Sequence, residues 1–399
     1  MDKHVSIKQL IKSKIFSMKI STLLLLSLLF ISCTSDSKET VSEIDFTLKS
    51  LSTSPFSNVV REYSIVPLET NDQSLIANVR KIACGNDIYL ILHSVFNTEY
   101  KICIFDLAGK FVNVINAQGG GPEEYLHISD FDIHPLRNIV SIVDPGNNEI
   151  LDFDVNGSFL RSRKVDYWLK QICYLVCNDN VVKIITDTRS SKVNGNTNYD
   201  LFISDEFYNI EERYFPYKKP ISVGMGNALF YYKLDGFVGY YRPHTDLVYA
   251  LDCNGLSLRY KIDFPAEVLP SELTLDFLQS KVPGSEYTYF INYFESSSIL
   301  VFTFTYDKTN YIGLYDKQSG NELVIKNPPD PSCDCGKVIN IKGVCNNWFV
   351  LLADISNIHS ILEAMDPKRN KCIQSDVFPY IDQLDYNSNP VLILIKFTL

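Results

Sequence analysis

Short apolar segments alternate along most of the chain with turns made of Gly, Pro, Asn and Asp. The clearest stretch contains four runs of five or six residues, and these are 128–133, 139–144, 149–153 and 158–163. Runs of this length, with turn residues at both ends, are typical of antiparallel strands. We therefore predict a four-stranded unit in which 128–133 is the innermost strand and 158–163 the outermost.

The same unit recurs, each time with an Asp that closes an apolar run before a turn. These residues are Asp106, Asp154, Asp205, Asp252, Asp316 and Asp366, at intervals of 48, 51, 47, 64 and 50 residues. A period near fifty with strand–turn–strand content is typical of a β-propeller. The stretch from Arg61 to Leu399 is long enough for six such units. We predict an all-β fold, a six-bladed β-propeller of four-stranded antiparallel blades.

The N-terminus has the pattern of an export signal. Five lysines precede the apolar stretch Ile20–Ile31, which is shorter than the roughly 20 residues that a membrane-spanning helix needs. Phe30–Cys33 resembles a bacterial lipobox, in which the signal is cut before the Cys and its thiol carries lipid. We predict a lipoprotein signal peptide over 1–32 and lipidation of Cys33. The alternative is an ordinary secretory signal with an incidental Cys. The true start is either Met1 or Met18.

The residues that follow predict the domain organisation. From Thr34 to Ser57 the chain is rich in Ser, Thr, Asp and Glu, which is typical of a flexible tether. We expect 33–60 to be the lipidated Cys and linker, and 61–399 to be the propeller. Lipid would hold the protein on the outer membrane without a spanning segment. The sequence leaves open whether it faces the periplasm or the cell surface.

Composition and charge narrow the class of partner. Hydrophobic residues make up 46% of the chain, and its 24 Tyr and 24 Phe favour the half-buried surfaces of strands. The net charge is −10, and no cluster of Lys and Arg interrupts the acidic surface. An acidic surface repels phosphate backbones, so we expect no nucleic-acid partner.

Cysteines and carboxylates offer little metal or cofactor chemistry. Six of the ten cysteines lie mostly in apolar runs and read as small core residues: Cys84, Cys103, Cys173, Cys177, Cys345 and Cys372. The one tight pair, Cys333 and Cys335, has the wrong spacing for zinc and predicts free thiols or a loop disulfide. Asp152–Gly157 imitates half of a calcium loop, but Arg163 stands where its Glu should be. We predict no metal and no cofactor, with the carboxylates capping a hairpin turn.

Several segments of the repeat resemble a known family. Gly119–Tyr125, Asp130–Asp132, Val143–Asp144 and Leu151–Leu160 together resemble an NHL-type repeat. More narrowly, the chain is similar to the six-bladed β-propeller lipoproteins of Bacteroidetes, whose two ends resemble Val66–Thr70 and Asn389–Leu392. The resemblance implies the propeller fold and an envelope location, and it implies no activity.

Strand alternation predicts where a ligand would bind. In a meander, the loops between blades share a face with the loops between second and third strands. That face carries irregular polar and aromatic loops, and loops on a rigid scaffold are where recognition usually lies. We predict a shared ligand cavity lined by Glu123, Glu124, Tyr125, Arg242 and His244. The alternative is that the two Glu residues cap strands and that Arg242 pairs with Asp246.

Two functions remain on this basis. The favoured one is a lipid-anchored binding or interaction module for a peptide, glycan or partner protein. The alternative is an envelope hydrolase or lyase with a metal in the central channel.

The apolar segments Tyr63–Leu68 and Val391–Leu399 lie at opposite ends of the body. Because an open sheet edge invites aggregation, we predict that they complete the same or adjoining blades.

Overall fold

The computed structural model describes residues 41–399, except 86, 168, 178–181, 188–198, 218–230, 235, 280–283 and 328–338. The predicted signal peptide, Cys33 and the Cys333–Cys335 loop lie outside the described residues. Among the helices described, none is long and apolar enough to cross a membrane.

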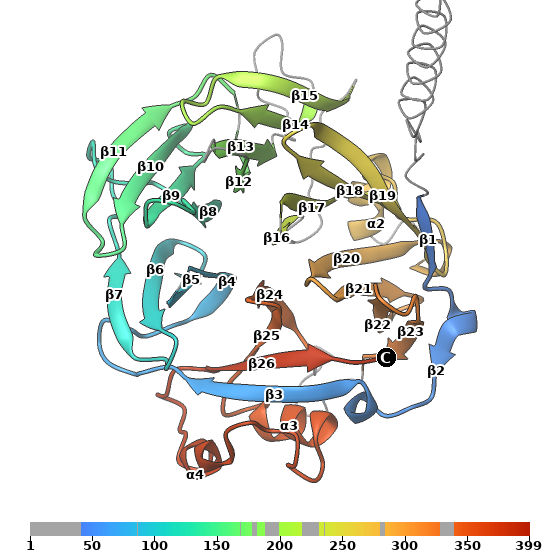
Figure 1. Cartoon of the computed structure of the whole chain (residues 1–399). Coiled ribbons are helices and arrows are strands. Elements are labelled where there is room, and N and C mark those ends of the chain that lie inside the picture. Colours follow the sequence, from blue (N-terminus) through green and yellow to red (C-terminus); the bar gives the residue numbers. More distant parts are fainter. Residues whose placement is uncertain are drawn as a thin grey trace, which may run out of the picture. The chain divides into compact units, whose positions relative to one another are not determined.

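The strands of the described ranges form six sheets, shown in Figure 1. Four sheets have four strands each. The first is β4 (Asn78–Cys84), β5 (Ile88–Val95), β6 (Glu99–Asp106) and β7 (Phe111–Ile115). The second is β8 (Asp130–Ile133), β9 (Ile139–Asp144), β10 (Glu149–Asp154) and β11 (Phe159–Lys164). The third is β12 (Gln171–Val176), β13 (Val182–Asp187), β14 (Tyr199–Ser204) and β15 (Ile210–Pro216). The sixth is β24 (Ile341–Cys345), β25 (Trp348–Ala353), β26 (Val391–Phe397) and β3 (Val60–Pro67).

The fourth and fifth sheets gain a strand from the N-terminal segment. The fourth is β16 (Tyr231–Leu234), β17 (Phe237–Tyr241), β18 (Leu247–Asp252), β19 (Gly255–Asp263) and β1 (Ser42–Asp45). The fifth is β20 (Thr288–Glu295), β21 (Ile299–Tyr306), β22 (Thr309–Asp316), β23 (Glu322–Lys326) and β2 (Leu51–Ser52). The helices are short: α2 (Thr274–Leu278), α3 (Ile358–Met365) and α4 (Phe378–Ile381), with single 3-10 turns at Leu48–Ser50, Phe56–Asn58, Ser271–Leu273, Gly284–Glu286 and Ser375–Val377.

The first strands of successive sheets face one another around a centre (Figure 1). Strand β4 contacts β8, β8 contacts β12, β12 contacts β17, β16 contacts β20, β20 contacts β24, and β24 contacts β4 again. This arrangement is a β-propeller with four-stranded antiparallel blades. The predicted all-β propeller class is therefore confirmed.

Burial falls from the inside of a blade to its outside. In β9 every residue after Ile139 is buried, whereas no residue of the outermost strand β11 is. Inner strands are covered by the neighbouring blades on both faces, so they read as continuous apolar runs. The four strands predicted over 128–163 correspond to β8, β9, β10 and β11.

The recurrent Asp is a turn cap between the third and fourth strands. In the clearest copy, Oδ1 of Asp154 accepts the backbone N–H groups of Asn156 (2.9 Å) and Ser158 (2.8 Å). Gly157 lies between them with a φ of 78°, a conformation that glycine adopts without strain. Asp106 and Asp205 make the same two bonds. Asp252 also caps its turn by accepting the Asn254 N–H, and Asp316 by accepting those of Gln318 and Ser319.

Asp366 was expected to be the sixth copy, and that assignment is wrong. It follows helix α3 and accepts the backbone N–H of Lys371 at 2.7 Å. The sixth sheet has no third-to-fourth turn, because its third strand is C-terminal and its fourth strand is N-terminal. Helices α3 and α4 lie instead in an insertion between β25 and β26.

The two ends of the body meet in that sheet, as predicted. Strand β26 pairs antiparallel with β3, with Val391 opposite Pro67 and Ile395 opposite Tyr63. Each strand thereby covers an edge that would otherwise be open to association with other chains.

The segment before β3 corrects the predicted linker. Strand β1 pairs parallel with β19 and β2 pairs parallel with β23, so residues 42–52 extend two blades and are not a tether. Ile44 and Phe46 are fully buried. A Cβ on Gly313 would lie 2.7 Å from the Phe46 ring, so the glycine leaves room for that side chain. These apolar side chains and the open outer edges of β19 and β23 explain why the polar segment folds.

One cysteine assignment also changes. Cys177 was expected to be a small core residue, but it forms a disulfide with Cys253 across 76 residues. The bond joins the end of β12 to the turn after β18. In the chain-entropy model a loop of this length contributes about 4 kcal/mol to stability.

Candidate functional site

A cavity of about 380 Å³ lies among the first strands of the sheets. All six sheets contribute to its wall, which consists of Lys81, Ile82, Ala83, Cys84, Asp132, Ile172, Cys173, Lys233, Leu234, Glu295, Ser297, Val344, Asn346 and Asn347. The volume lies within the range of small-molecule sites, which are mostly apolar with a few placed polar groups. This wall is more polar than that, because seven of its fourteen residues are polar or charged.

The cavity lies toward one face of the ring. Ser297, Asn346 and Asn347 belong to turns that join first strands to second strands. The Ser297 N–H donates to the Asn347 side-chain oxygen at 2.7 Å, which ties the turns of neighbouring blades together. Because turns alternate between faces in a meander, this is the face opposite the loops predicted to bind ligand.

A buried ion pair holds two blades at the cavity wall. Lys81 Nζ lies 2.8 Å from Asp130 Oδ1 and also donates to the Phe131 carbonyl at 2.6 Å. The other Asp130 oxygen accepts the Ile172 N–H at 2.9 Å, which adds a third blade. Burial raises the pKa of the Asp130 carboxyl, and Lys81 opposes that shift. Lys81 and the backbone N–H donors thus favour the charged carboxylate against the effect of burial.

A second pair links more distant blades. Lys233 Nζ lies 2.7 Å from Asp132 Oδ2, and that oxygen also accepts the Tyr174 N–H at 2.8 Å. Burial alone lowers the pKa of Lys233, but the Asp132 carboxylate outweighs it, and the pKa lies above its usual value. Lys233 is thus a fixed cation in the channel.

The charge of a third carboxylate, that of Glu295, is balanced by cations that do not line the cavity. Glu295 is fully buried and lies 2.9 Å from Arg259 and 2.5 Å from Lys317. Tyr293 also donates its hydroxyl to Glu295. Burial lowers the pKa of Lys317 in spite of Glu295. A Cβ on Gly239 would lie 2.3 Å from the Tyr293 hydroxyl, so glycine is needed there.

The charged side chains of the wall differ in what they present to the cavity. The exposed fraction is 42% for Lys233, 10% for Lys81, 9% for Asp132 and zero for Glu295. The accessible charge of the cavity is therefore positive, although the chain as a whole carries a net charge of −10.

The predicted loop residues lie elsewhere. Tyr125 is fully buried, and its hydroxyl donates to the Tyr100 carbonyl at 2.7 Å. It is a core residue and does not face a cavity. Glu124 is half-buried and accepts the Gly121 N–H at 2.7 Å, which closes its own loop. Glu123 is exposed on that loop.

Arg242 and His244 occupy the loop between β17 and β18, as predicted. Arg242 stacks over the Phe215 ring at 4.3 Å and lies 3.6 Å from Asp200, not from Asp246 as the alternative expected. His244 Nδ1 is 3.0 Å from the Leu269 carbonyl. His244 lines a cavity of about 510 Å³ that Arg242, Glu123, Glu124 and Tyr125 do not line. A ligand shared by the two surface loops stays a prediction, and the buried Tyr125 would not contact it.

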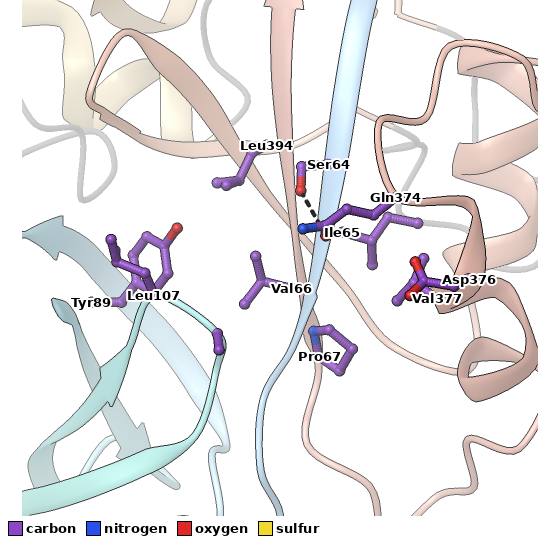
Figure 2. A pocket seen from close by; sticks show the side chains of 11 residues that line it. Ser64, Ile65, Val66, Pro67, Tyr89, Leu107, Gln374, Asp376, Val377 and Leu394 are labelled. Atoms are coloured by element: carbon purple, nitrogen blue, oxygen red, sulfur yellow. Dashed lines mark hydrogen bonds between the residues drawn. The ribbon is translucent and has the colours of Figure 1, made fainter. Parts of the chain in front are cut away.

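A further groove of about 360 Å³ lies beside the closing sheet (Figure 2). Tyr89 and Leu107 form one side, and Asp376 and Val377 form the other, with β3 between them. Gln374 closes over the strand by accepting a hydrogen bond from Ser64 at 3.2 Å. Unlike the channel cavity, this groove has no Lys or Arg in its wall.

No group of three or more His, Cys, Asp and Glu side chains that could hold a metal occurs in the ranges described. Asp154 of the half calcium loop caps its turn, and Asp152 pairs with Arg161 at 2.7 Å. The carboxylates of that motif are thus occupied within the blade.

One feature of the sequence indicates the channel cavity. Asp130 and Asp132 alternate with apolar residues in a strand predicted to be innermost, and carboxylates there need cationic partners. Lys81 and Lys233 are 49 and 101 residues away in the sequence from those partners, so only the ring arrangement reveals the pairs.

Comparisons with known proteins identify the family. Residues 40–396 match a domain of unknown function, DUF4934, and the chain belongs to this family. No curated protein matches the chain. A protein of Bacteroides fragilis, whose name marks it as a candidate exported protein, has a TM-score of 0.71 at 19% identity, covering 90% of this chain and 100% of that chain. A DUF4221 member from Bacteroides vulgatus has a TM-score of 0.51 at 10% identity, covering 85% and 97%. At these identities the likeness shows the fold alone.

The Lys81 pair gives a stability prediction. Lys81→Met should lower the free energy of unfolding by about 3–5 kcal/mol, because it leaves the Asp130 carboxylate buried without its cation. Adding Asp130→Asn should restore most of the loss. Lys261→Met is the matched control, since Lys261 is 53% exposed and lies 3.8 Å from Glu43; its loss should stay below about 1 kcal/mol. Urea unfolding measures all four proteins, and equal losses for Lys81→Met and Lys261→Met would contradict the account.

Proposed function

We propose that this protein is a binding module of the bacterial cell envelope that holds a small polar ligand in its channel cavity. The observation that carries the proposal is the wall to which six sheets contribute and in which the most exposed charge is Lys233. A site assembled from several rigid strands holds its groups in fixed positions, which favours recognition.

The wall supports an anionic ligand. Lys233 has three N–H donors, and its hydrogen bonds among the described residues are with the Asp132 carboxylate and the Ile133 carbonyl. A carboxylate of the ligand would take the remaining donor. Side-chain amides of Asn346 and Asn347 would bind hydroxyl or carbonyl groups beside apolar Leu234. An acidic sugar of a glycan or the carboxyl end of a peptide has this chemistry.

We also propose a number of blades for the ring. Six sheets and the closed series of contacts among their innermost strands support a six-bladed ring with NHL-type repeats. Each sheet then contributes one first strand to the channel.

We also propose that the protein is exported and anchored by lipid on Cys33 in the outer membrane, facing the periplasm or the surface. The lipobox-like Phe30–Cys33 supports this, and so does the exported class named for the Bacteroides fragilis relative. A lipid anchor would present the propeller to ligands of the envelope.

The anchor predicts a change in partitioning. Cys33→Ser should move the protein from the detergent phase to the aqueous phase of a cloud-point separation, because the lipidated thiol is gone. Ser35→Ala leaves the Cys in place and should partition like the unchanged protein. Detergent partitioning of Cys33→Ser equal to that of the unchanged protein would rule out lipidation at this residue.

The binding proposal predicts selectivity for acids. In ligand-observed NMR, D-glucuronate should give saturation-transfer signals that D-glucose lacks, and glycylglycine should exceed its C-terminal amide. Lys233→Gln should abolish the difference, because it removes the cation, while Lys261→Gln should keep it. The proposal fails if the acids bind no better than their neutral partners, or if Lys233→Gln binds them unchanged.

A further inference from the structure

Two thiols end the first strands of neighbouring blades. Cys84 is the last residue of β4 and Cys345 the last residue of β24, and these strands are in contact. The two side chains belong to one apolar cluster, and Cys84 Sγ lies 4.0 Å from the carbonyl oxygen of Val344, the residue before Cys345. The closeness of the backbones is seen at Gly343, where a Cβ would lie 2.8 Å from the Ile82 carbonyl oxygen.

The two thiols differ in access. Cys84 lines the channel cavity, together with Lys233, whereas Cys345 is 3% exposed and does not line it. A small molecule in the cavity therefore reaches Cys84 before Cys345.

The pKa values of the two thiols are shifted in opposite directions, which also favours reaction at Cys84. The neighbouring Cys345 thiol lowers the pKa of the Cys84 thiol, with help from the Asn346 backbone and the Lys233 ammonium, while burial opposes the shift. The Cys84 thiol and burial raise the pKa of Cys345 well above its usual value. The thiolate is the nucleophile in disulfide exchange, so the accessible thiol is also the reactive one.

We propose that Cys84 and Cys345 form a redox-active dithiol in the channel wall that low-molecular-weight disulfides oxidise. The Cys84 thiolate attacks one sulfur of a disulfide RSSR, which forms a Cys84–SR mixed disulfide and releases RS⁻. The Cys345 thiol then loses its proton and attacks Cys84 Sγ, which forms the Cys84–Cys345 bond and releases the second RS⁻. The protein loses two electrons and two protons, and one RSSR becomes two RSH.

The other free cysteines of the described chain lack this arrangement. Burial raises the pKa of Cys103 to about 11 and that of Cys173 to about 12. Cys372 is half-buried, and burial raises its pKa as well. Cys372 is therefore the matched control, as a partly accessible thiol without a low pKa. The dithiol proposal does not depend on the ligand proposed for the cavity.

The test uses the full chain and oxidised glutathione as the probe. After incubation, remaining thiols are alkylated and the digest is analysed by mass spectrometry without reduction. The unchanged protein and Cys372→Ser should both yield a Cys84–Cys345 cross-link. Cys345→Ser should stop at a glutathione adduct on Cys84, and Cys84→Ser should yield neither adduct nor cross-link at Cys345.

A second measurement uses only the unchanged protein and therefore does not depend on the folding of any variant. In the unchanged protein, limited alkylation with iodoacetamide should modify Cys84 at least about tenfold faster than Cys345. Failure to form the cross-link, an adduct that begins at Cys345, or equal alkylation of the two thiols would overturn the proposal.

Discussion

The pairing of β26 with β3 is the contact on which the rest of the structure depends. It joins residues 391–397 to residues 60–67 and covers one edge of each strand. Apart from the added strands β1 and β2, the other sheets described are built from consecutive strands, and this sheet pairs the last strand of the chain with an N-terminal one. If β3 left β26, the contact between β24 and β4 would lose its support, and the channel cavity would lose part of its wall.

The channel concentrates buried charge that an apolar core would not need. Asp130, Asp132 and Glu295 each have a cation from another strand, and the pairs cross between blades. A buried pair contributes little net stability compared with apolar packing, because both charges lose hydration. These pairs instead fix the positions of the blades relative to one another. The pair with Asp132 also fixes Lys233 in the cavity wall. The thiols of Cys84 and Cys345 lie at the ends of β4 and β24, which are in contact and belong to the first and the sixth sheet.

Local sequence predicted local structure well. The Asp turns and the strands over 128–163 follow from short-range chemistry, because Asp154 caps the residues directly after it. Ring closure followed from an argument about sheet edges. What could not be predicted depends on contacts between distant residues: the seating of Phe46 over Gly313, the disulfide between Cys177 and Cys253, and the pairing of Lys233 with Asp132. The predicted site consists of polar surface loops, whereas the cavity is lined mostly by strand residues. That these residues converge on one cavity follows only once the blades are placed in a ring.

Hydrogen–deuterium exchange of the intact protein, resolved by peptide, tests the closure directly. Amides of β3 and β26 should be as strongly protected as those of the central strands β5 and β9, and they should become exposed together in rising denaturant, because one pairing protects both. Strand β3 is an outer edge strand, as β1 and β2 are, but β1 and β2 are shorter, with four and two residues against eight, and should exchange sooner. If β3 exchanged as quickly as β1 while β25 stayed protected, the ring would not depend on this pairing, and the account would be contradicted.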